Sequence, residues 1–378
     1  MNICIFSANY LPNIGGVERY TYYLSKELIK KGHAVTVVTN NVFDLASYEI
    51  QDGIELFRLP CYNVMNGRYP IHKKNRTFYD IDATLCAKNF DIVIVNTRFY
   101  FHSLYGAKFA YKKNIRCITI EHGTAHLTVN NPVFDLLGQA WEHLITAVLK
   151  RYCHEFYGVS KAACAWSAHF KIKSNGVLYN AVDVFEIEEL MKNPVCSYKK
   201  ELGIPQNATV VAFTGRIIPE KGVVQLVEAF KNINKQDAYL ILAGDGPLLN
   251  TLKVSDKRII FLGKIDFNHV ISLLNESDIF CLPSVSEGFS TSVLEAVAAK
   301  NFIITTKAGG TKELISSEKY GIITESNTVQ EVEDALKKAI DDIDYRNSAI
   351  NEAYNRLCEN FTWEKTAQKV VEIIKKGK

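Results

Sequence analysis

A strand–helix–strand unit is predicted at the start of the chain by residues 2–40, NICIFSANYLPNIGGVERYTYYLSKELIKKGHAVTVVTN. The mostly apolar residues 2–8 indicate a buried strand, and AVTVVT at 34–39 indicates a second one. Between them, apolar side chains recur at the spacing of a helix, at Tyr20, Tyr23, Leu24, Leu28 and Ile29. A helix that connects two such strands predicts a parallel sheet with helices on its faces.

The same alternation continues along the chain. Further strands are predicted at 91–96, 116–122 and 155–160, and after a polar stretch they resume at 209–215, 238–246, 258–265, 278–284 and 302–310. We therefore expect an α/β protein with two doubly wound domains that meet near residues 180–186. Ligands of such sheets bind beyond the carboxyl ends of the strands, so the loops that follow strands are the places to look for function.

Bulk composition excludes several classes of protein. A chain of 378 residues suits two domains of roughly 150–190 residues each. No apolar run reaches the ~18 residues of a membrane span, and we expect no signal peptide. The nine cysteines are scattered without a CxxC pair, which indicates reduced thiols in the cytoplasm and not zinc ligands.

The net charge of +3 conceals an uneven distribution. Residues 1–180 carry 20 Lys and Arg against 13 Asp and Glu, whereas residues 181–378 carry 24 against 28. A basic first half could face phosphates or an anionic membrane surface. The alternative is an ordinary solvated surface with uneven charge.

Two loops that precede helices are suited to binding an anion. In NIGGVER at 13–19, Gly15 and Gly16 let backbone amides approach an anion at a helix N-terminus, although paired glycines also simply form turns. In TGRIIPEKG at 214–222, Arg216 and Lys221 offer two cations to a diphosphate. As an alternative, these two residues could pair with acidic neighbours.

The most informative motif is EGFSTSVLE at 287–295. Gly288, Phe289 and Ser290 are expected to present backbone amides where the chain enters a helix, and Thr291 lies in its first turn. Glu295 is expected about two turns inside the helix, where it could accept hydrogen bonds from a ribose diol. Two exposed helix carboxylates are the alternative, but the apolar flanks favour a buried helix.

Eight motifs occur in order along the chain: GGVER, EHG, GVS, NAVD, GRIIPEKG, AGDGP, EGFSTSVLE and AGGTKE. Together they resemble the retaining glycosyltransferases of family four, the type that builds bacterial polysaccharides and lipid-linked glycans. The resemblance spans nearly the whole chain and implies the GT-B fold, two Rossmann-like domains that face each other across a cleft. It implies an acceptor-binding domain at 1–182, a nucleotide-sugar domain at 183–360, and a C-terminal helix at 361–378 that returns to the first domain.

The resemblance also implies roles for particular residues. Arg216 and Lys221 would hold the donor diphosphate, and Glu295 would bind the ribose. The sugar hydroxyls would be held by Glu287 and by the residues after it, Gly288, Phe289, Ser290 and Thr291. From the first domain, Gly15 and Gly16 would close on the phosphates, and His122 would face the reacting sugar or the acceptor hydroxyl. A histidine after a strand can also be a structural hydrogen bonder.

The implied reaction is the metal-independent transfer of a hexose-type sugar from a nucleotide diphosphate, with no cofactor. Family frequency favours UDP over GDP. Retention is expected through same-face attack, with the leaving phosphate taking the acceptor proton. Asp80 and Asp82, and likewise Asp342 and Asp344, have the DxD spacing of metal-binding transferases, but both pairs lie in polar, helix-like stretches that predict surface carboxylates.

The acceptor is expected to be a glycan, and a lipid-linked one is our hypothesis. The segment YNVMNGRYPIHKKNR at 62–76 mixes apolar residues with Arg68, Lys73, Lys74 and Arg76, as a surface that lies on anionic lipid does. This segment predicts peripheral attachment at the inner face of the cell membrane. A loop over the acceptor site is the alternative.

Two other functions share this architecture. A sugar-nucleotide 2-epimerase of GT-B fold is the nearest enzymatic alternative, and a catalytically silent binding protein is the other. The ordered motifs favour a transferase over the first, and the presence of Arg216, Lys221, Glu287 and His122 argues against the second. Nucleic-acid binding is not expected, because the basic residues are dispersed and no known module is present.

Overall fold

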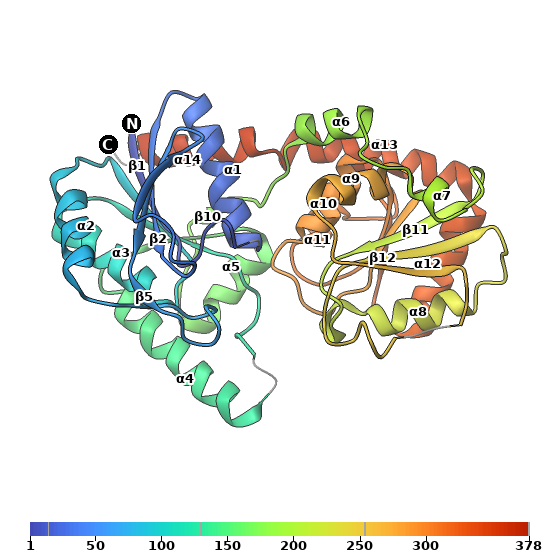
Figure 1. Ribbon diagram of the computed structural model, residues 1–378, viewed down its shortest axis with the longest axis horizontal. Helices are drawn as coiled ribbons and strands as arrows, with labels where there is room; N and C mark the ends of the chain where they lie inside the picture. The colour runs from blue at the N-terminus through green and yellow to red at the C-terminus, as the bar shows by residue number, and fades with distance from the viewer. Residues whose placement is uncertain (14, 129–130, 253–254, 377–378) are drawn as a thin grey trace. The chain divides into compact units, whose positions relative to one another are not determined.

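The computed structural model describes residues 1–13, 15–128, 131–252 and 255–376, and it divides into two compact units (Figure 1). Unit 1 comprises Met1–Asn180 and Trp363–Lys378, and unit 2 comprises Ala181–Thr362. The predicted domain boundaries lie two residues from these divisions at both places where the chain passes between the units. Among the described residues, no helix is long and apolar enough to cross a membrane.

Unit 1 is built around a sheet with the strand order β10-β9-β8-β7-β1-β2-β4-β3, in which only β3 runs antiparallel to its neighbour. The strands are β1 (Asn2–Phe6), β2 (Ala34–Asn40), β3 (Tyr48–Gln51), β4 (Ile54–Leu59), β7 (Ile92–Asn96), β8 (Cys117–Glu121), β9 (Glu155–Gly158) and β10 (Gly176–Val177). A short hairpin of β5 (Cys61–Tyr62) and β6 (Ile71–His72) lies outside this sheet. The chain therefore reverses its direction of winding between β1 and β7.

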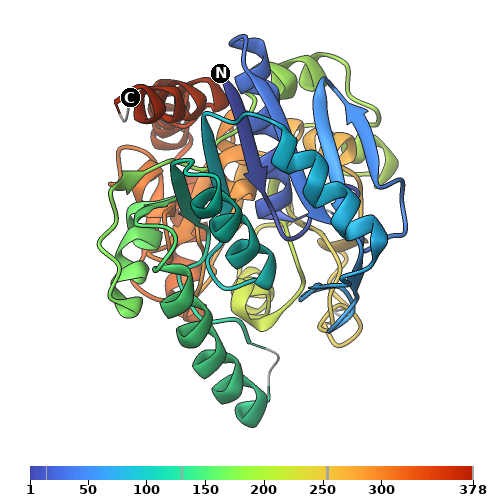
Figure 2. The same cartoon turned by 90° about the vertical axis from the view of Figure 1, so that its left-hand side faces the viewer.

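Helices cover both faces of this sheet, as Figure 2 shows with unit 1 toward the viewer. They are α1 (Gly16–Lys30), α2 (Arg76–Ala87), α3 (Phe101–Lys112), α4 (Pro132–Leu149), α5 (Lys161–Ser167) and α14 (Trp363–Lys376). A short 3₁₀ helix, η1 (Ala168–Phe170), directly follows α5. The C-terminal α14 belongs to this unit, as predicted. Its Thr366 hydroxyl donates to the carbonyl of Tyr179 at 2.9 Å, and Trp363 stacks on Tyr23 at 5.9 Å between ring centres.

Unit 2 is built around a parallel sheet in the order β13-β12-β11-β14-β15-β16. Its strands are β11 (Thr209–Thr214), β12 (Ala238–Ala243), β13 (Ile259–Gly263), β14 (Ile279–Leu282), β15 (Phe302–Thr306) and β16 (Ile322–Thr324). The helices are α6 (Val184–Lys192), α7 (Tyr198–Glu201), α8 (Val223–Lys231), α9 (Phe267–Asn275), α10 (Thr291–Ala298), α11 (Thr311–Leu314), α12 (Val329–Asp341) and α13 (Ile343–Asn360), with a 3₁₀ turn, η2, at Pro219–Lys221. This strand order is that of dinucleotide-binding sheets, with a switch point between β11 and β14.

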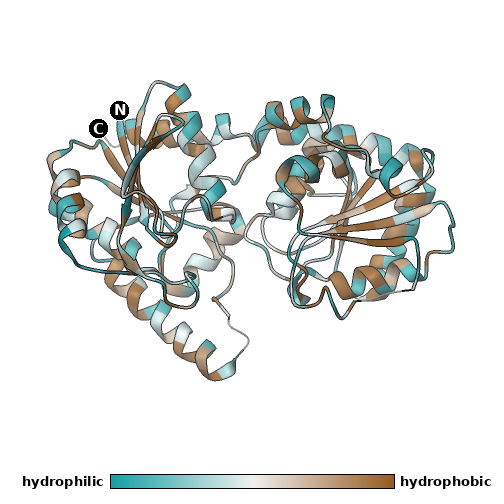
Figure 3. Ribbon diagram, in the orientation of Figure 1, coloured by the Kyte–Doolittle hydropathy of each residue, from teal (hydrophilic) through white to brown (hydrophobic). Residues whose placement is uncertain are grey.

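The central strands are apolar on both faces, as parallel sheets covered by helices require. Residues 3–6 of β1 and 210–213 of β11 are essentially inaccessible to solvent, and Figure 3 shows the strands of each unit in the colour of hydrophobic residues. Burial of this kind is the main favourable term that holds each unit together. It leaves polar side chains chiefly at the strand ends.

Six strands were not predicted from the sequence, β3, β4, β5, β6, β10 and β16, and the two longest of these are β3 and β4. Their pattern is interrupted by charged residues that find partners in the fold. Arg58 of β4 is buried and pairs with Glu49 of β3 at 2.5 Å, and Glu55 of β4 binds Lys88 at 2.9 Å. Because these partners are distant in sequence, the apolar pattern alone did not reveal the strands.

Candidate active site

In unit 2, two loops meet at the carboxyl ends of β11 and β14, where the direction of winding reverses. The first loop, residues 215–222, carries Arg216 and Lys221, and the second, residues 283–290, carries Glu287. Open α/β sheets bind their ligands at such a point. The fold thus brings together the two segments that the sequence singled out.

Close backbone contact holds these two loops against each other. A Cβ atom on Gly222 would lie 2.0 Å from the carbonyl oxygen of Pro283, and Gly222 has a φ of 69°, so glycine is required on both counts. The Ser284 hydroxyl and the Val285 amide both donate to the carbonyl of Glu220 at 2.9 Å. The backbones of the two loops are therefore fixed relative to each other.

The side chains at this junction include an ion pair and an exposed cation. The ammonium of Lys221 contacts a carboxylate oxygen of Glu287, and both side chains are largely buried. The guanidinium of Arg216 is exposed and makes no hydrogen bond or ion pair with any residue that the structure describes. An ion pair, and an exposed arginine carried by the same loop as its lysine, thus lie beyond the strand ends, where a diphosphate and a polyol could bind.

A third loop supports the Glu287 segment from the other side. The Gly310 amide donates to the carbonyl of Gly288 at 2.9 Å, and a Cβ atom on Gly309 would lie 1.8 Å from the carbonyl of Glu287. Phe289 is buried and stacks on Phe361 at 5.3 Å between ring centres. The Phe289 side chain therefore holds the loop in place, and the prediction for this residue concerns only its backbone amide.

Helix α10 starts one residue after Ser290, which is buried at its N-cap position. Thr291 is the first helical residue, as predicted. The predicted depth of Glu295 was wrong: it is the fifth residue of the helix, little more than one turn from its start. Glu295 is 3% exposed, so its carboxylate lies in the packed face of α10 and close to the helix entrance.

In unit 1, His122 follows β8 and lies against two neighbouring elements. Its Nε2 is 3.1 Å from Oδ1 of Asn96, at the end of β7, and its ring meets Tyr20 edge-on at 4.8 Å. Asn96 donates through Nδ2 to the Thr21 hydroxyl at 2.7 Å, so its oxygen faces the histidine and accepts the Nε2 proton. The lone pair of His122 is therefore on Nδ1. Burial lowers the pKa of His122 to about 3, which keeps the ring neutral.

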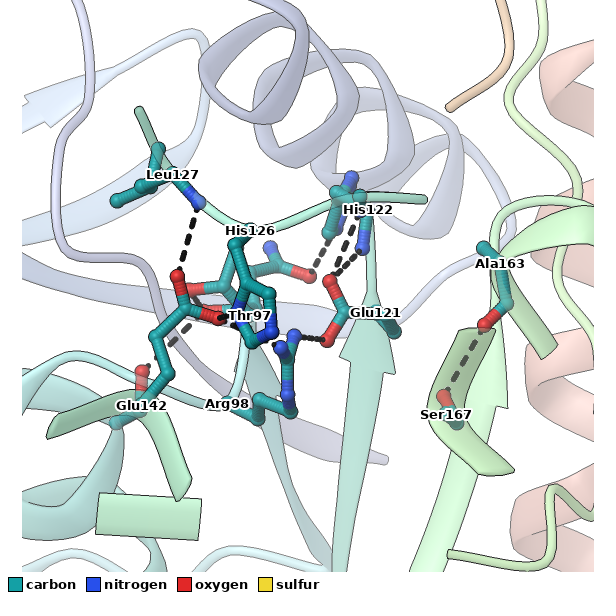
Figure 4. A network of polar contacts seen from close by, with 12 residues as sticks. Thr97, Arg98, Glu121, His122, His126, Leu127, Glu142, Ala163 and Ser167 are labelled. Carbon is teal, nitrogen blue, oxygen red and sulfur yellow. Dashed lines mark hydrogen bonds and ion pairs between the residues drawn. The ribbon is translucent and has the colours of Figure 1, made fainter. Parts of the chain in front are cut away.

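A buried network that sequence reasoning missed lies beside His122 (Figure 4). Arg98 is 2% exposed and binds two carboxylates, Glu121 through Nη1 and Glu142 through Nη2 at 2.9 Å. Glu121 also accepts from the backbone amides of His122 and Gly123, at 3.0 and 2.9 Å. Buried charges that are paired and hydrogen-bonded in this way fix the conformation of the segment that carries His122. The sequence feature that could have identified Arg98 as a site residue is its position directly after the predicted strand at 91–96.

For one member of the glycine pair of unit 1, Gly15, the structure supplies a steric reason. Gly15 is the N-cap of α1 in extended conformation, and a Cβ atom there would lie 2.4 Å from a carboxylate oxygen of Glu18. A Cβ atom on Gly16 would meet nothing within 4 Å. Asn13 donates to the Glu18 carboxylate at 3.0 Å, and burial raises the pKa of Glu18. Phosphate binding by Gly15 and Gly16 stays a prediction.

The two DxD sequences lie in or at the start of helices, as predicted. Asp82 in α2 accepts from the Tyr105 hydroxyl at 2.6 Å, and Asp80 is exposed beside it. Asp342 caps α13 by accepting from the Tyr345 amide at 2.9 Å, with Asp344 in the first turn.

The chain also carries an exposed apolar face on α4, the helix that extends beyond the sheet in Figure 2. Its exposed apolar residues are Val133, Phe134, Leu136, Leu137 and Leu144. Trp141 of the same helix donates to the hydroxyl of Tyr69 at 2.7 Å, which joins α4 to the predicted lipid-facing segment 62–76. In that segment Tyr62 and Met65 are exposed.

Comparison with known proteins decides the family. The protein-family model described as Glycosyltransferase Family 4 matches residues 14–185 of the sequence. The protein-family model described as Glycosyl transferases group 1 matches residues 197–356. The chain belongs to the family-four glycosyltransferases. One relative of this glycosyltransferase is an uncharacterized glycosyltransferase of Methanocaldococcus jannaschii, 25% identical over 393 residues that cover 100% of this chain and 98% of the relative.

Two further similarities bear on substrates and fold. The glycosyltransferase is 23% identical, over 98% of its length and 96% of the relative, to the Escherichia coli UDP-Gal:α-D-GlcNAc-diphosphoundecaprenol α-1,3-galactosyltransferase. Its structure resembles that of Anabaena HepE in complex with UDP-glucose, with a TM-score of 0.75, 18% identity and complete coverage of both chains. The fold is therefore GT-B, with two Rossmann-like domains.

Proposed function

We propose that this glycosyltransferase moves a hexose from a UDP-sugar to a lipid-linked glycan acceptor, with retention at the anomeric carbon, in the synthesis of a cell-surface polysaccharide or glycoconjugate. The observation that carries the proposal is the pairing of Lys221 with Glu287 at the switch point of the unit 2 sheet, with the exposed Arg216 in the same loop as Lys221.

The chemistry of the donor explains why these charges matter. Cleavage of the bond between sugar and diphosphate builds negative charge on the leaving group and positive charge on the sugar ring. Arg216 and Lys221 would stabilise the first, and Glu287 would bind sugar hydroxyls while it holds Lys221 in position. Preorganised charges of this kind usually supply the largest part of a rate enhancement.

Two comparisons support UDP over GDP. The Escherichia coli relative is named for its UDP-Gal donor, and Anabaena HepE was solved with UDP-glucose. Glu295, at the entrance of α10, is the residue that we propose for the ribose hydroxyls. Its short distance from the helix start places it nearer to the loop at 287–290 than the sequence suggested.

For retention we propose same-face attack, in which the acceptor hydroxyl bonds to the anomeric carbon as the diphosphate leaves and takes the hydroxyl proton. No divalent metal is required in this scheme, because Arg216 and Lys221 neutralise the diphosphate. His122 is neutral, with its lone pair on Nδ1, and is suited to accept a hydrogen bond from a sugar or acceptor hydroxyl.

The lipid-linked acceptor is supported by the surface of unit 1. The apolar face of α4 and the segment at 62–76 are joined through Trp141 and Tyr69, so apolar and basic side chains belong to one region. Arg68, Lys73, Lys74 and Arg76 are exposed there. A surface of this composition suits binding to an anionic bilayer, because each Lys or Arg near the bilayer contributes ~1 kcal/mol to the free energy of binding. The acceptor of the Escherichia coli relative, by its name, is linked to diphosphoundecaprenol.

A panel of nucleotide sugars tests the proposal before the acceptor is known. Purified protein is incubated with UDP-, GDP-, ADP- and dTDP-linked hexoses, and the released nucleotide is quantified. We expect slow release of UDP from one UDP-hexose, with water as the substitute acceptor. Release of GDP alone would overturn the choice of nucleotide, and a released sugar that is consistently inverted would overturn retention.

A further inference from the structure

Three histidines from three different segments converge in unit 1. His126 lies in the loop after β8, His143 on α4 and His169 in η1. The Nε2 atom of His169 is 3.2 Å from Nε2 of His126 and 3.2 Å from Nε2 of His143. One ring nitrogen from each of the three lies within 4.8 Å of the others. We propose that His126, His143 and His169 form a binding site for a transition-metal ion of the Zn²⁺ class.

The distances agree with tetrahedral coordination. Nitrogen ligands at ~2.05 Å from zinc lie about 3.3 Å from one another when the arrangement is tetrahedral. Both 3.2 Å contacts of His169 Nε2 match this distance between ligand nitrogens. The remaining pair, His126 and His143, would close by a small rotation of His143, whose side chain is exposed.

Hydrogen bonding among the rings does not account for this arrangement. In a neutral imidazole a ring nitrogen has either one proton or one lone pair, so it makes one well-directed hydrogen bond. Nε2 of His169 faces two other ring nitrogens at the same distance. A metal ion between the three rings satisfies all of their lone pairs at once.

The protonation of His126 is already set for metal binding. Its Nδ1 is 3.0 Å from Oε2 of Glu142, and a carboxylate can only accept, so Nδ1 carries the proton and the lone pair is on Nε2. Glu142 is itself held by Arg98 and by the amide of Leu127, at 2.9 Å each. Ligating histidines in metal sites typically donate their other ring proton to such a carboxylate, which fixes the ring.

The orientation of His169 is fixed by packing. Trp166 stacks on its ring with 4.9 Å between ring centres and an interplanar angle of 6°. Two of the three ligands are thus positioned before any ion binds, and only the exposed His143 must adjust. Such preorganisation favours binding, because little side-chain freedom remains to be lost.

Three imidazoles select the class of ion. Imidazole suits zinc, copper and nickel, whereas magnesium and calcium require oxygen ligands. Three protein ligands leave a fourth position for water or another small ligand. An ion here would connect the loop that follows His122 to α4 and η1, and it uses none of the residues proposed for the donor. The inference is therefore independent of the proposed function.

Cobalt binding tests the site directly. Chain without a histidine tag is freed of metal and titrated with Co²⁺, whose tetrahedral complexes absorb visible light. We expect visible bands that saturate at one ion per chain, without the near-ultraviolet band of thiolate ligands, and their replacement by Zn²⁺. His143→Ala and His169→Ala should lose the bands, and His154→Ala, which removes an exposed histidine outside the cluster, should keep them.

Thermal unfolding gives a second readout on the same variants. Zn²⁺ should raise the Tm of the wild-type chain and of His154→Ala, because an ion that binds only the folded state stabilises it. It should leave the Tm of His143→Ala unchanged, and circular dichroism shows whether that variant is folded. The proposal is overturned if the wild-type chain binds no ion, if thiolate bands accompany binding, or if folded His143→Ala and His169→Ala bind as tightly as the wild type.

Discussion

The ammonium of Lys221 lies against the carboxylate of Glu287, although 66 residues separate them in sequence. The contact exists because β11 and β14 are neighbours in the sheet and the loops that follow them are packed backbone to backbone. It aligns a cation for the leaving diphosphate with a carboxylate for the sugar. The motif around each residue was visible in the sequence, but their contact required the strand order.

The neutral state of His122 predicts the pH dependence of turnover. Because burial lowers its pKa to about 3, His122 stays neutral from pH 5 to 8 and adds no inflection to the pH profile of kcat in that range. His122→Ala should lower kcat at least ~10-fold through loss of a hydrogen-bond acceptor near the reacting groups. The measurement is kcat against pH for both forms at saturating donor.

Asn96→Asp provides the matching test of the contact between Asn96 and His122. A carboxylate beside Nε2 favours the protonated ring, so the pKa of His122 should rise and an inflection should enter the pH profile. A profile identical to that of the wild type, from a folded variant, would contradict the contact between position 96 and the His122 ring.

Two other buried histidines predict acid sensitivity of unit 1. Burial lowers the pKa of His102 to about 3 and that of His72 to about 4, whereas both are near 6.5 in an unfolded chain. As the pH falls below ~6.5 the unfolded state binds protons first, so each histidine lowers the free energy of unfolding by ~1.4 kcal/mol per pH unit. The free energy of unfolding should therefore be constant above pH ~6.5 and should decline as the pH falls toward 4.

Urea unfolding at a series of pH values measures this slope. Nε2 of His72 lies 3.0 Å from Nδ1 of His102, and His102 donates from Nε2 to the carbonyl of Val38 at 2.9 Å. His72→Gln keeps a donor toward His102 and removes one titrating group, so the slope below pH 6 should fall by ~1.4 kcal/mol per pH unit. An unchanged slope in that variant would show that His72 does not titrate as described.

The apolar face of α4 predicts binding to anionic vesicles. Phe134→Ser with Leu137→Ser removes two side chains that are each 60% or more exposed, so folding should be preserved. Burial of either side chain in lipid contributes ~1.5 kcal/mol or more to the free energy of binding. We therefore expect the double variant to lose vesicle affinity by ~10–100-fold. Sedimentation with phosphatidylglycerol vesicles at low salt measures it.

Phe185→Ser is the matched control for that experiment. Phe185 is 72% exposed on α6 of unit 2, outside the proposed lipid surface, and its replacement should leave sedimentation unchanged. Wild-type protein that stays in the supernatant with anionic vesicles would remove the membrane proposal and leave the donor chemistry intact.

Chelation should not abolish donor cleavage. The proposed mechanism neutralises the diphosphate with Arg216 and Lys221, so release of UDP should continue in excess EDTA at a rate within about twofold of the untreated enzyme. Addition of Mg²⁺ or Mn²⁺ after chelation should not raise it further. A strict requirement for either ion would contradict the proposed roles of the two cations.

The sequence predicted most of the fold and part of the site. Strands that are buried on both faces, such as 91–96 and 209–215, have uninterrupted apolar runs, and glycines such as Gly222 mark where backbones touch. Strand β4, which lies next to the edge strand β3, was missed because Arg58 and Glu55 interrupt its pattern and find their partners only in the fold. The same reason hid the network around Arg98, whose two carboxylates lie 23 and 44 residues away in sequence.

The most direct measurement is the steady-state rate of UDP release, with donor saturating, for the wild type, Arg216→Ala, Lys221→Ala and the exposed control Lys257→Ala. Loss of one preorganised charge typically costs ~2.7–4 kcal/mol, so the first two variants should be ~100–1000-fold slower and the control unchanged. If folded Arg216→Ala and Lys221→Ala turn over at the wild-type rate, these cations do not stabilise the leaving diphosphate and the account of the donor site is wrong.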